Sequence, residues 1–120
     1  MNVLISGARN MPEKWREFMR QQLALLPVGT VIVHGGAKGA DTMAGEIAEE
    51  LGFEVIVERA NWKDLGKAAG PERNQRMLSK YKPGLALFFH DDPTLGTGTC
   101  DMYKRCCQAR VVCRICLYPS

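Results

Sequence analysis

The chain alternates between short apolar runs and longer segments in which apolar residues recur at helical spacing. The apolar runs predict strands over residues 3–5, 31–33, 53–57, 85–89 and 111–117. The helical spacing predicts helices over residues 12–26, from about 41 to 51, 72–80 and 100–109. Continuous apolar strands separated by helices are typical of a parallel sheet covered on both faces. We therefore predict a small doubly wound, Rossmann-like α/β fold with three layers and a mostly parallel sheet of about five strands.

This fold class directs attention to the loops that follow the strands. Open parallel sheets bind ligands at the carboxyl ends of their strands, close to the point where the strand order reverses. The loops expected at that edge are residues 6–11, 34–41, 58–72 and 90–100. A length of 120 residues fits one domain, residues 1–120.

A glycine-rich segment follows the second predicted strand and leads into the second predicted helix. It reads Gly35-Gly36-Ala37-Lys38-Gly39-Ala40-Asp41. Glycines at such a place let the backbone approach a ligand closely, and the N–H groups of the loop and of the helix start attract phosphate. The spacing matches neither the dinucleotide fingerprint nor the Walker loop. The alternative is a tight turn in which Asp41 caps the helix.

A second segment of small residues, Gly96-Thr97-Gly98-Thr99, precedes the last predicted helix. Its two glycines and two hydroxyls make another candidate anion site. The alternative is a flexible loop with Thr99 as the helix cap. Two such segments at one edge of the same sheet favour a phosphate-bearing ligand more strongly than either does alone.

Aromatic and charged residues in the other loops are further candidates. Trp62 lies in a polar stretch, where its indole could stack on a base or could instead anchor the loop to the core. Arg73 and Asn74 could contact phosphate or ribose, unless Arg73 pairs with a neighbouring acid. Arg9, after the first strand, is a candidate phosphate ligand or a solvated surface arginine.

Charge and hydropathy narrow the classes of partner. The formal net charge of +3 is too small to indicate nucleic acid by itself. The charge is unevenly spread, however, because residues 41–58 hold six acids and no base, whereas residues 59–82 hold seven bases and two acids. No apolar run is long enough to span a bilayer, and the start does not resemble an export signal. We therefore expect a cytoplasmic protein with no membrane partner.

The cysteines and histidines do not form an obvious reactive centre. All five cysteines fall in the last 21 residues, which favours reduced thiols over a disulfide framework. Cys113 and Cys116 have the spacing of half a metal site, but they lie in a predicted strand, where positions three apart face opposite sides. We therefore expect no bound metal. His34 and His90 each end a strand and could touch a ligand, although neither has an evident partner for nucleophilic catalysis.

Taken in order, these motifs resemble the YspA-like branch of the SLOG superfamily, which is named for the Smf/DprA and LOG (lonely guy) proteins. The resemblance rests on the segment 35–41, Trp62, Ala69-Gly70-Pro71-x-Arg73-Asn74-x-x-Met77 and Gly96-Thr97-Gly98-Thr99-x-Asp101. Ser6-Gly7-Ala8-Arg9 is similar to the family's first-loop pattern of glycine, serine and arginine, in a changed order.

The resemblance implies a Rossmann-like domain that binds nucleotides or nucleotide-derived ligands without a cofactor, with Gly7 and Arg9 among the binding residues. It also implies a homodimer or larger assembly, and members of this branch are frequent in phage and bacterial genomes.

One departure from the family pattern bears on catalysis. The phosphoribohydrolases of the LOG branch carry a glycine–threonine pair followed three positions later by a catalytic glutamate, and here Met102 stands in that place. Asp101 comes one position earlier, which on a helix turns it by about 100°. Asp41 or Asp101 could substitute for the glutamate, and the catalytic residue stays unassigned.

Three functions are therefore open. The first is a module, of a kind that a phage could encode, that senses or sequesters a small phosphorylated nucleotide or nucleotide second messenger. The second is a nucleoside 5′-monophosphate N-glycosidase in which Asp41 or Asp101 serves the ribose or the attacking water. The third is binding of single-stranded nucleic acid, as in the Smf/DprA branch. We favour the first because the sequence shows no paired acid and base, and we do not expect nucleic acid as the partner.

Overall fold

The computed structural model describes residues 1–92 and 94–119, so Pro93, in the loop expected over 90–100, lies outside it. Within the described residues, five parallel strands form one sheet in the order β3-β2-β1-β4-β5. The strands are β1 (Asn2–Gly7), β2 (Val31–His34), β3 (Glu54–Val57), β4 (Leu85–Phe89) and β5 (Val112–Cys116). The predicted Rossmann-like α/β fold is confirmed.

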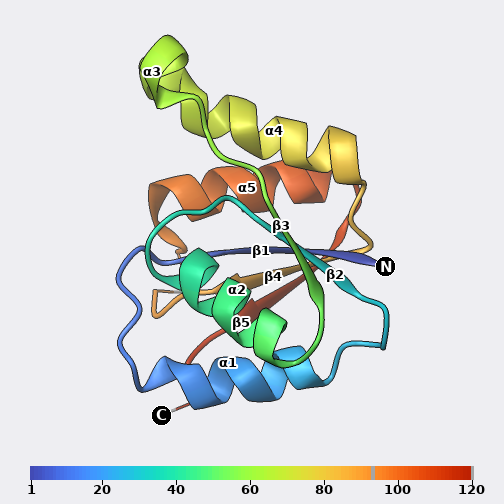
Figure 1. The fold of residues 1–120 in the computed structure, drawn as a ribbon. Helices are drawn as coiled ribbons and strands as arrows, with labels where there is room; N and C mark the ends of the chain where they lie inside the picture. Colours follow the sequence, from blue (N-terminus) through green and yellow to red (C-terminus); the bar gives the residue numbers. More distant parts are fainter. Residues whose placement is uncertain (93, 120) are drawn as a thin grey trace.

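Helices cover both faces of the sheet (Figure 1). One face carries α1 (Trp15–Ala24) and α2 (Ala40–Glu50), and the other carries α4 (Ala69–Tyr81) and α5 (Gly96–Gln108). A short helix α3 (Trp62–Leu65) and a 3-10 turn η1 (Gly66–Ala68) precede α4 and lie at the outer end of the molecule. Across the described residues, no helix combines the length and the apolar character that crossing a bilayer requires.

The central strands contribute side chains to two separate cores, because successive residues of a strand face opposite sides of the sheet. In β1, Val3 and Ile5 pack under α1 and α2, whereas Leu4 packs under α4 and α5. The residues of β4 alternate between the two cores in the same way. Both faces of these strands are therefore buried, which explains why their sequences are continuously apolar.

Several boundaries differ from those predicted. The strand β1 continues through Gly7, α4 begins at Ala69 instead of residue 72, and α5 begins at Gly96 instead of residue 100. The loop expected from residue 59 to 71 contains α3 and η1. Pro71 fits inside α4 because the first helical turn does not use its backbone N–H groups for intrahelical bonds.

The strand order reverses between β1 and β4. The chain adds β2 and β3 on one side of β1, then crosses back to place β4 and β5 on the other side. At the carboxyl ends of this central pair, Gly7 stands opposite Phe89, and the N–H group of Ala8 donates to the carbonyl oxygen of Phe89 at 2.9 Å. The loops beyond this point diverge and leave the crevice at which sheets of this class bind ligands.

Candidate functional site

A cavity of about 570 Å³ opens at this crevice. Its walls come from the residues after β1, the first turn of α5, the start of α4, and Trp62. The volume lies within the range of about 300–1,000 Å³ that is typical of small-molecule sites. The sequence-predicted residues that line it are Gly7, Arg9, Ala37, Asp41, Trp62, Arg73, Asn74, Gly96, Thr97, Gly98, Thr99 and Asp101.

A second cavity of about 440 Å³ adjoins the first and shares Arg9, Ala37, Trp62 and Arg73 with it. The residues that line only the second cavity are Gly35, Gly36, Lys38, Arg59 and Ala60. Of the binding residues predicted from the sequence, Gly39 therefore lines neither cavity.

The first three backbone N–H groups of the glycine-rich loop are engaged within the protein. Those of Gly35 and Ala37 donate to Oδ2 of Asp41 at 3.1 and 3.3 Å, and that of Gly36 donates to Nδ1 of His34 at 3.0 Å. This differs from the open phosphate cradle expected here. Asp41 is not a simple helix cap either, because its carboxylate ties the loop to the first turn of α2.

The glycines of this loop make room for other groups. A Cβ at Gly35 would lie 2.1 Å from Nη1 of Arg73, and one at Gly36, where φ is +73°, would lie 2.7 Å from Nη1 of Arg59. At Gly39, φ is +84° and a Cβ would lie 2.3 Å from the carbonyl oxygen of Ala8. The lack of a side chain at Gly35 and Gly36 thus makes room for Arg73 and Arg59. The lack of one at Gly39 makes room for the loop that follows β1.

Asp41 and His34 are both buried beneath the loop, with exposed fractions of 6% and 5%. Burial raises the pKa of Asp41 to about 6, although the N–H groups of the loop and Arg73 favour its charged form. Burial also lowers the pKa of His34 to about 4, with Arg59 and Arg73 adding to the effect. Nε2 of His34 faces Gly45 of α2, so His34 does not reach the ligand edge, whereas His90 lines the first cavity.

The first turn of α5 is the more open of the two predicted anion sites. Thr99 lies inside this helix, and its hydroxyl donates to the carbonyl oxygen of Gly7 at 3.0 Å, which fixes the helix against β1. Gly96, Thr97 and Gly98 are exposed along the cavity, and a Cβ at Gly98 would meet nothing within 4 Å. Thr99 therefore fixes α5 to the end of β1, and the three residues before it face the cavity.

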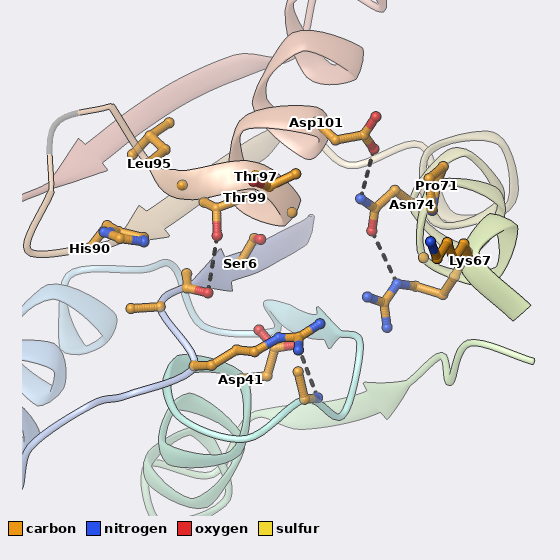
Figure 2. Close-up of a pocket in the computed structure, with 18 of the residues that line it drawn as sticks. Ser6, Asp41, Lys67, Pro71, Asn74, His90, Leu95, Thr97, Thr99 and Asp101 are labelled. Atoms are coloured by element: carbon orange, nitrogen blue, oxygen red, sulfur yellow. Dashed lines mark hydrogen bonds between the residues drawn. The ribbon is translucent and has the colours of Figure 1, made fainter. Parts of the chain in front are cut away.

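A hydrogen-bonded row crosses the wall between α4 and α5 (Figure 2). Arg73 donates to Oδ1 of Asn74 at 3.0 Å, and Nδ2 of Asn74 donates to Oδ2 of Asp101 at 2.9 Å. The same Oδ2 accepts from Nε of Arg105 at 2.9 Å. Burial opposes the charge on Asp101, but Arg105 and Asn74 outweigh it and lower the pKa of this carboxyl group.

Met102 does not occupy a catalytic position. It is 2% exposed and packs in the core under α4 and α5, whereas Asp101 faces the cavity. The neighbouring carboxylate of Asp101 is held by Asn74 and Arg105.

Several lining residues were missed from the sequence. Lys67 reaches the first cavity from η1, a turn that has no apolar periodicity to predict it. Arg59 lies two residues after β3, just as Arg9 lies two residues after β1, so its position beyond a strand end was a usable signal. The remaining missed residues are Ser6, Ala8, Ala60, Gly70, Pro71 and Leu95.

The fold and the site together define a Rossmann-like α/β protein with a cation-lined pocket where the strand order reverses. Residues 1–64 match the model of the YAcAr family, described as the YspA, cpYpsA-related SLOG family. The chain belongs to this family, which confirms the resemblance seen in its motifs.

Two known proteins are similar to the chain. The gene 61 protein of Mycobacterium phage D29 is 37% identical over 106 residues, which cover 82% of this chain and 83% of that protein. The X-ray structure of DNA processing protein A (DprA) from Streptococcus pneumoniae matches with a TM-score of 0.60 and 16% sequence identity. That match covers 94% of this chain and 58% of the other, and at this identity it shows a shared fold alone.

Proposed function

We propose that the chain binds a small phosphorylated, nucleotide-derived ligand in the first cavity and serves as a sensor or sequestering module. One observation carries this proposal. The cavity lies at the reversal of strand order, and it gathers Arg9, Lys67 and Arg73 from three separate segments around the open first turn of α5. The SLOG family membership and the phage relative support a nucleotide-related binding module.

The phosphate would lie against the first turn of α5. The N–H groups at a helix start and its partial positive charge favour an anion. Thr97 adds a hydroxyl donor on the same turn, and Lys67 adds a mobile positive charge from the opposite wall. Both carboxylates of the cavity, Asp41 and Asp101, already accept hydrogen bonds from the protein, which reduces their repulsion of a bound phosphate.

The base would stack on Trp62. This side chain is 53% exposed, so it does not anchor the loop in the core. It borders both cavities, and the edge of its indole lies beside Gly70 at the start of α4. An accessible indole at a site with cationic neighbours is suited to stacking with a nucleobase.

A nucleoside 5′-monophosphate N-glycosidase is the second candidate, and the position of Asp101 in the cavity favours it. Such an enzyme needs a carboxylate free to stabilise an oxocarbenium-like transition state or to activate water. Because Oδ2 of Asp101 accepts from both Asn74 and Arg105, the carboxylate is better placed to position the wall than to react. We therefore place binding before hydrolysis, and binding of single-stranded nucleic acid third.

The test is a thermal-shift and calorimetric screen of the purified chain against nucleoside monophosphates and the corresponding nucleosides, with a product check after incubation. We expect a nucleotide to bind and its nucleoside to bind much more weakly, without release of free base. Lys67→Gln and Trp62→Ala should weaken binding, whereas Lys63→Gln, a neighbouring exposed lysine that lines neither cavity, should not. Equal affinity for nucleotide and nucleoside would refute the phosphate site, and release of free base would establish the enzyme instead.

We also propose that the chain forms a homo-oligomer through β5. This strand lies at an edge of the sheet, where its outer N–H and C=O groups have no strand partner among the described residues. Val112 and Ile115, which face opposite sides of β5, and the following Leu117 and Tyr118 are exposed apolar residues that flank this edge. A second copy of the chain would cover this surface.

A further inference from the structure

Among the described residues, the second cavity is lined by positive side chains and by no acid. Arg9, Lys38, Arg59 and Arg73 come from four different segments and border the same hollow of about 440 Å³. The remaining lining residues are glycines, alanines and Trp62. The cavity is thus large enough for an anionic group and has positive charge on several sides.

These four cations lack carboxylate partners in the described part of the chain. None of them makes an ion pair with a described residue. By contrast, Arg16, Arg20, Arg76 and Arg105 each contact a carboxylate. Asp41 offsets part of the charge of Arg73, although the two side chains make no ion pair. Cations brought together repel one another, so the gathering of these four around one cavity favours an anion between them.

The backbone around this cavity holds the arginines in place, and the side chains are the groups available to bind an anion. The carbonyl oxygen of Gly35 accepts from Arg73 at 2.8 Å, and that of Gly36 accepts from Arg59 at 3.4 Å. The N–H groups of Gly35, Gly36 and Ala37 in the same loop are bound to Asp41 and His34. An anion here would therefore be held by guanidinium and ammonium groups, above all by those of Arg9, Lys38 and Arg59.

The two cavities adjoin each other. Arg9, Ala37, Trp62 and Arg73 line both, so a ligand that extended past these side chains would reach from the first cavity into the second. The first turn of α5 lines the first cavity, and Lys38 and Arg59 line the second. A ligand with a single phosphate would fill only one of these two anion sites.

We propose that the ligand carries two separated phosphate groups, as in a short linear dinucleotide, and that Arg59 and Lys38 bind the second phosphate. This inference rests on the proposed function, which supplies the first phosphate and the base. Arg59 and Lys38 thereby become specificity-determining residues that distinguish a two-phosphate ligand from a nucleoside monophosphate.

The test compares two probes by isothermal titration calorimetry: AMP and the 5′-phosphorylated linear dinucleotide pApA. A charge-assisted contact to the second phosphate should make pApA bind about 10- to 100-fold more tightly than AMP. Arg59→Gln and Lys38→Gln should each remove much of this gain and affect AMP far less. Lys63→Gln serves as the matched control because it removes a nearby exposed cation that lines neither cavity.

The outcomes separate this inference from the proposed function. If AMP binds, but pApA binds no more tightly and Arg59→Gln weakens both probes equally, the second phosphate site is wrong and the nucleotide site stands. If neither probe nor any other nucleotide binds, the proposed function itself fails. If long single-stranded DNA binds far more tightly than pApA, the closed two-phosphate site is also overturned. Arg59 is exposed and its one side-chain hydrogen bond is long, so unchanged circular dichroism is expected for its variant.

Discussion

Arg73 donates a hydrogen bond from Nη1 to the carbonyl oxygen of Gly35 at 2.8 Å, and its guanidinium fills the space that a side chain at position 35 would occupy. This contact joins α4 on one face of the sheet to the loop after β2, which leads to the other face. The glycine and the arginine are 38 positions apart in the sequence. The glycine is needed because of the arginine, and binding should depend on both.

We expect Gly35→Ala to weaken ligand binding while the fold is retained. The new methyl group would lie 2.1 Å from Nη1 of Arg73, and the end of a long side chain can move away where a backbone atom cannot. The loss of the Arg73 hydrogen bonds should cost about 1 kcal/mol of unfolding free energy. Calorimetry and urea denaturation would check both effects. If affinity stays at the wild-type level, Arg73 does not act from this position.

Gly39→Ala should be much more damaging to stability. Here φ is +84°, and a Cβ would lie 2.3 and 2.4 Å from the carbonyl oxygens of Ala8 and Arg9, which are backbone atoms. Strain in the left-handed region costs about 1–3 kcal/mol by itself, and the clash adds to it. Urea denaturation should show a loss larger than that of Gly35→Ala. Similar losses for the two variants would contradict the distinction drawn between them.

Gly98→Ala should raise stability and lower affinity together. A methyl group at this position meets no atom within 4 Å, and replacing glycine by alanine in a helix contributes up to about 1 kcal/mol. The same methyl group would project at the first turn of α5, where we place the phosphate. An increased melting temperature with unchanged nucleotide affinity would move the phosphate away from this turn.

Asp41 and His34 should give the folded chain opposite pH dependences that nearly cancel. The pKa of Asp41 is raised from 3.8 to about 6, so the stability it contributes is complete below pH 3.8 and is lost as the pH rises through 6. The pKa of His34 is lowered from 6.5 to about 4, so its contribution is complete above pH 6.5 and is lost as the pH falls toward 4. Each shift corresponds to about 3 kcal/mol.

Single substitutions should uncover each dependence. In Asp41→Asn the effect of His34 remains, and the free energy of unfolding should rise from about pH 4 to 6.5 relative to wild type. In His34→Asn, whose amide oxygen can still accept from Gly36, it should fall over the same range. Urea titrations at several pH values would measure both slopes. Parallel slopes for the two variants would show that the two groups do not oppose each other.

Ile115→Lys should convert an oligomer into a monomer. A lysine at Ile115 places a charge beside the edge of β5 that we assign to a second copy of the chain. Val28→Lys is the control, because Val28 is fully exposed in the turn between α1 and β2. Sedimentation velocity would measure the mass of each variant. A wild-type chain that sediments as a monomer would refute this interface.

The central strands could be predicted because their burial on both faces leaves an uninterrupted apolar run. The edge strand β5 was also found, although Val112 and Ile115 are exposed. The early start of α5 could not be predicted, because glycine and threonine favour helices weakly. In the folded chain, the hydroxyl of Thr99 in this helical turn donates to the carbonyl oxygen of Gly7, which lies 92 positions away in the sequence. A contact over such a distance cannot be seen in the local sequence.

The candidate site was predictable in its location and less so in its chemistry. Arg9 and Lys38 lie in loops that follow strands, Arg73 lies where a helix was predicted to begin, and all three line the second cavity. The engagement of the loop N–H groups by Asp41 and His34 depends on side-chain directions, which spacing does not determine. The position of Lys67 at the cavity could not be predicted, because it lies on η1, a turn that is defined by packing and not by a sequence pattern.

The reversal of strand order divides the pocket between two consecutive stretches of the chain. Residues up to Trp62 build the wall that holds the glycine-rich loop, and residues from Lys67 onward build the wall that holds α5. The pairing of β1 with β4 joins these stretches. A chimera that takes one stretch from a relative would therefore have to keep this pairing and also the Gly35–Arg73 and Gly7–Thr99 contacts that cross between the two walls.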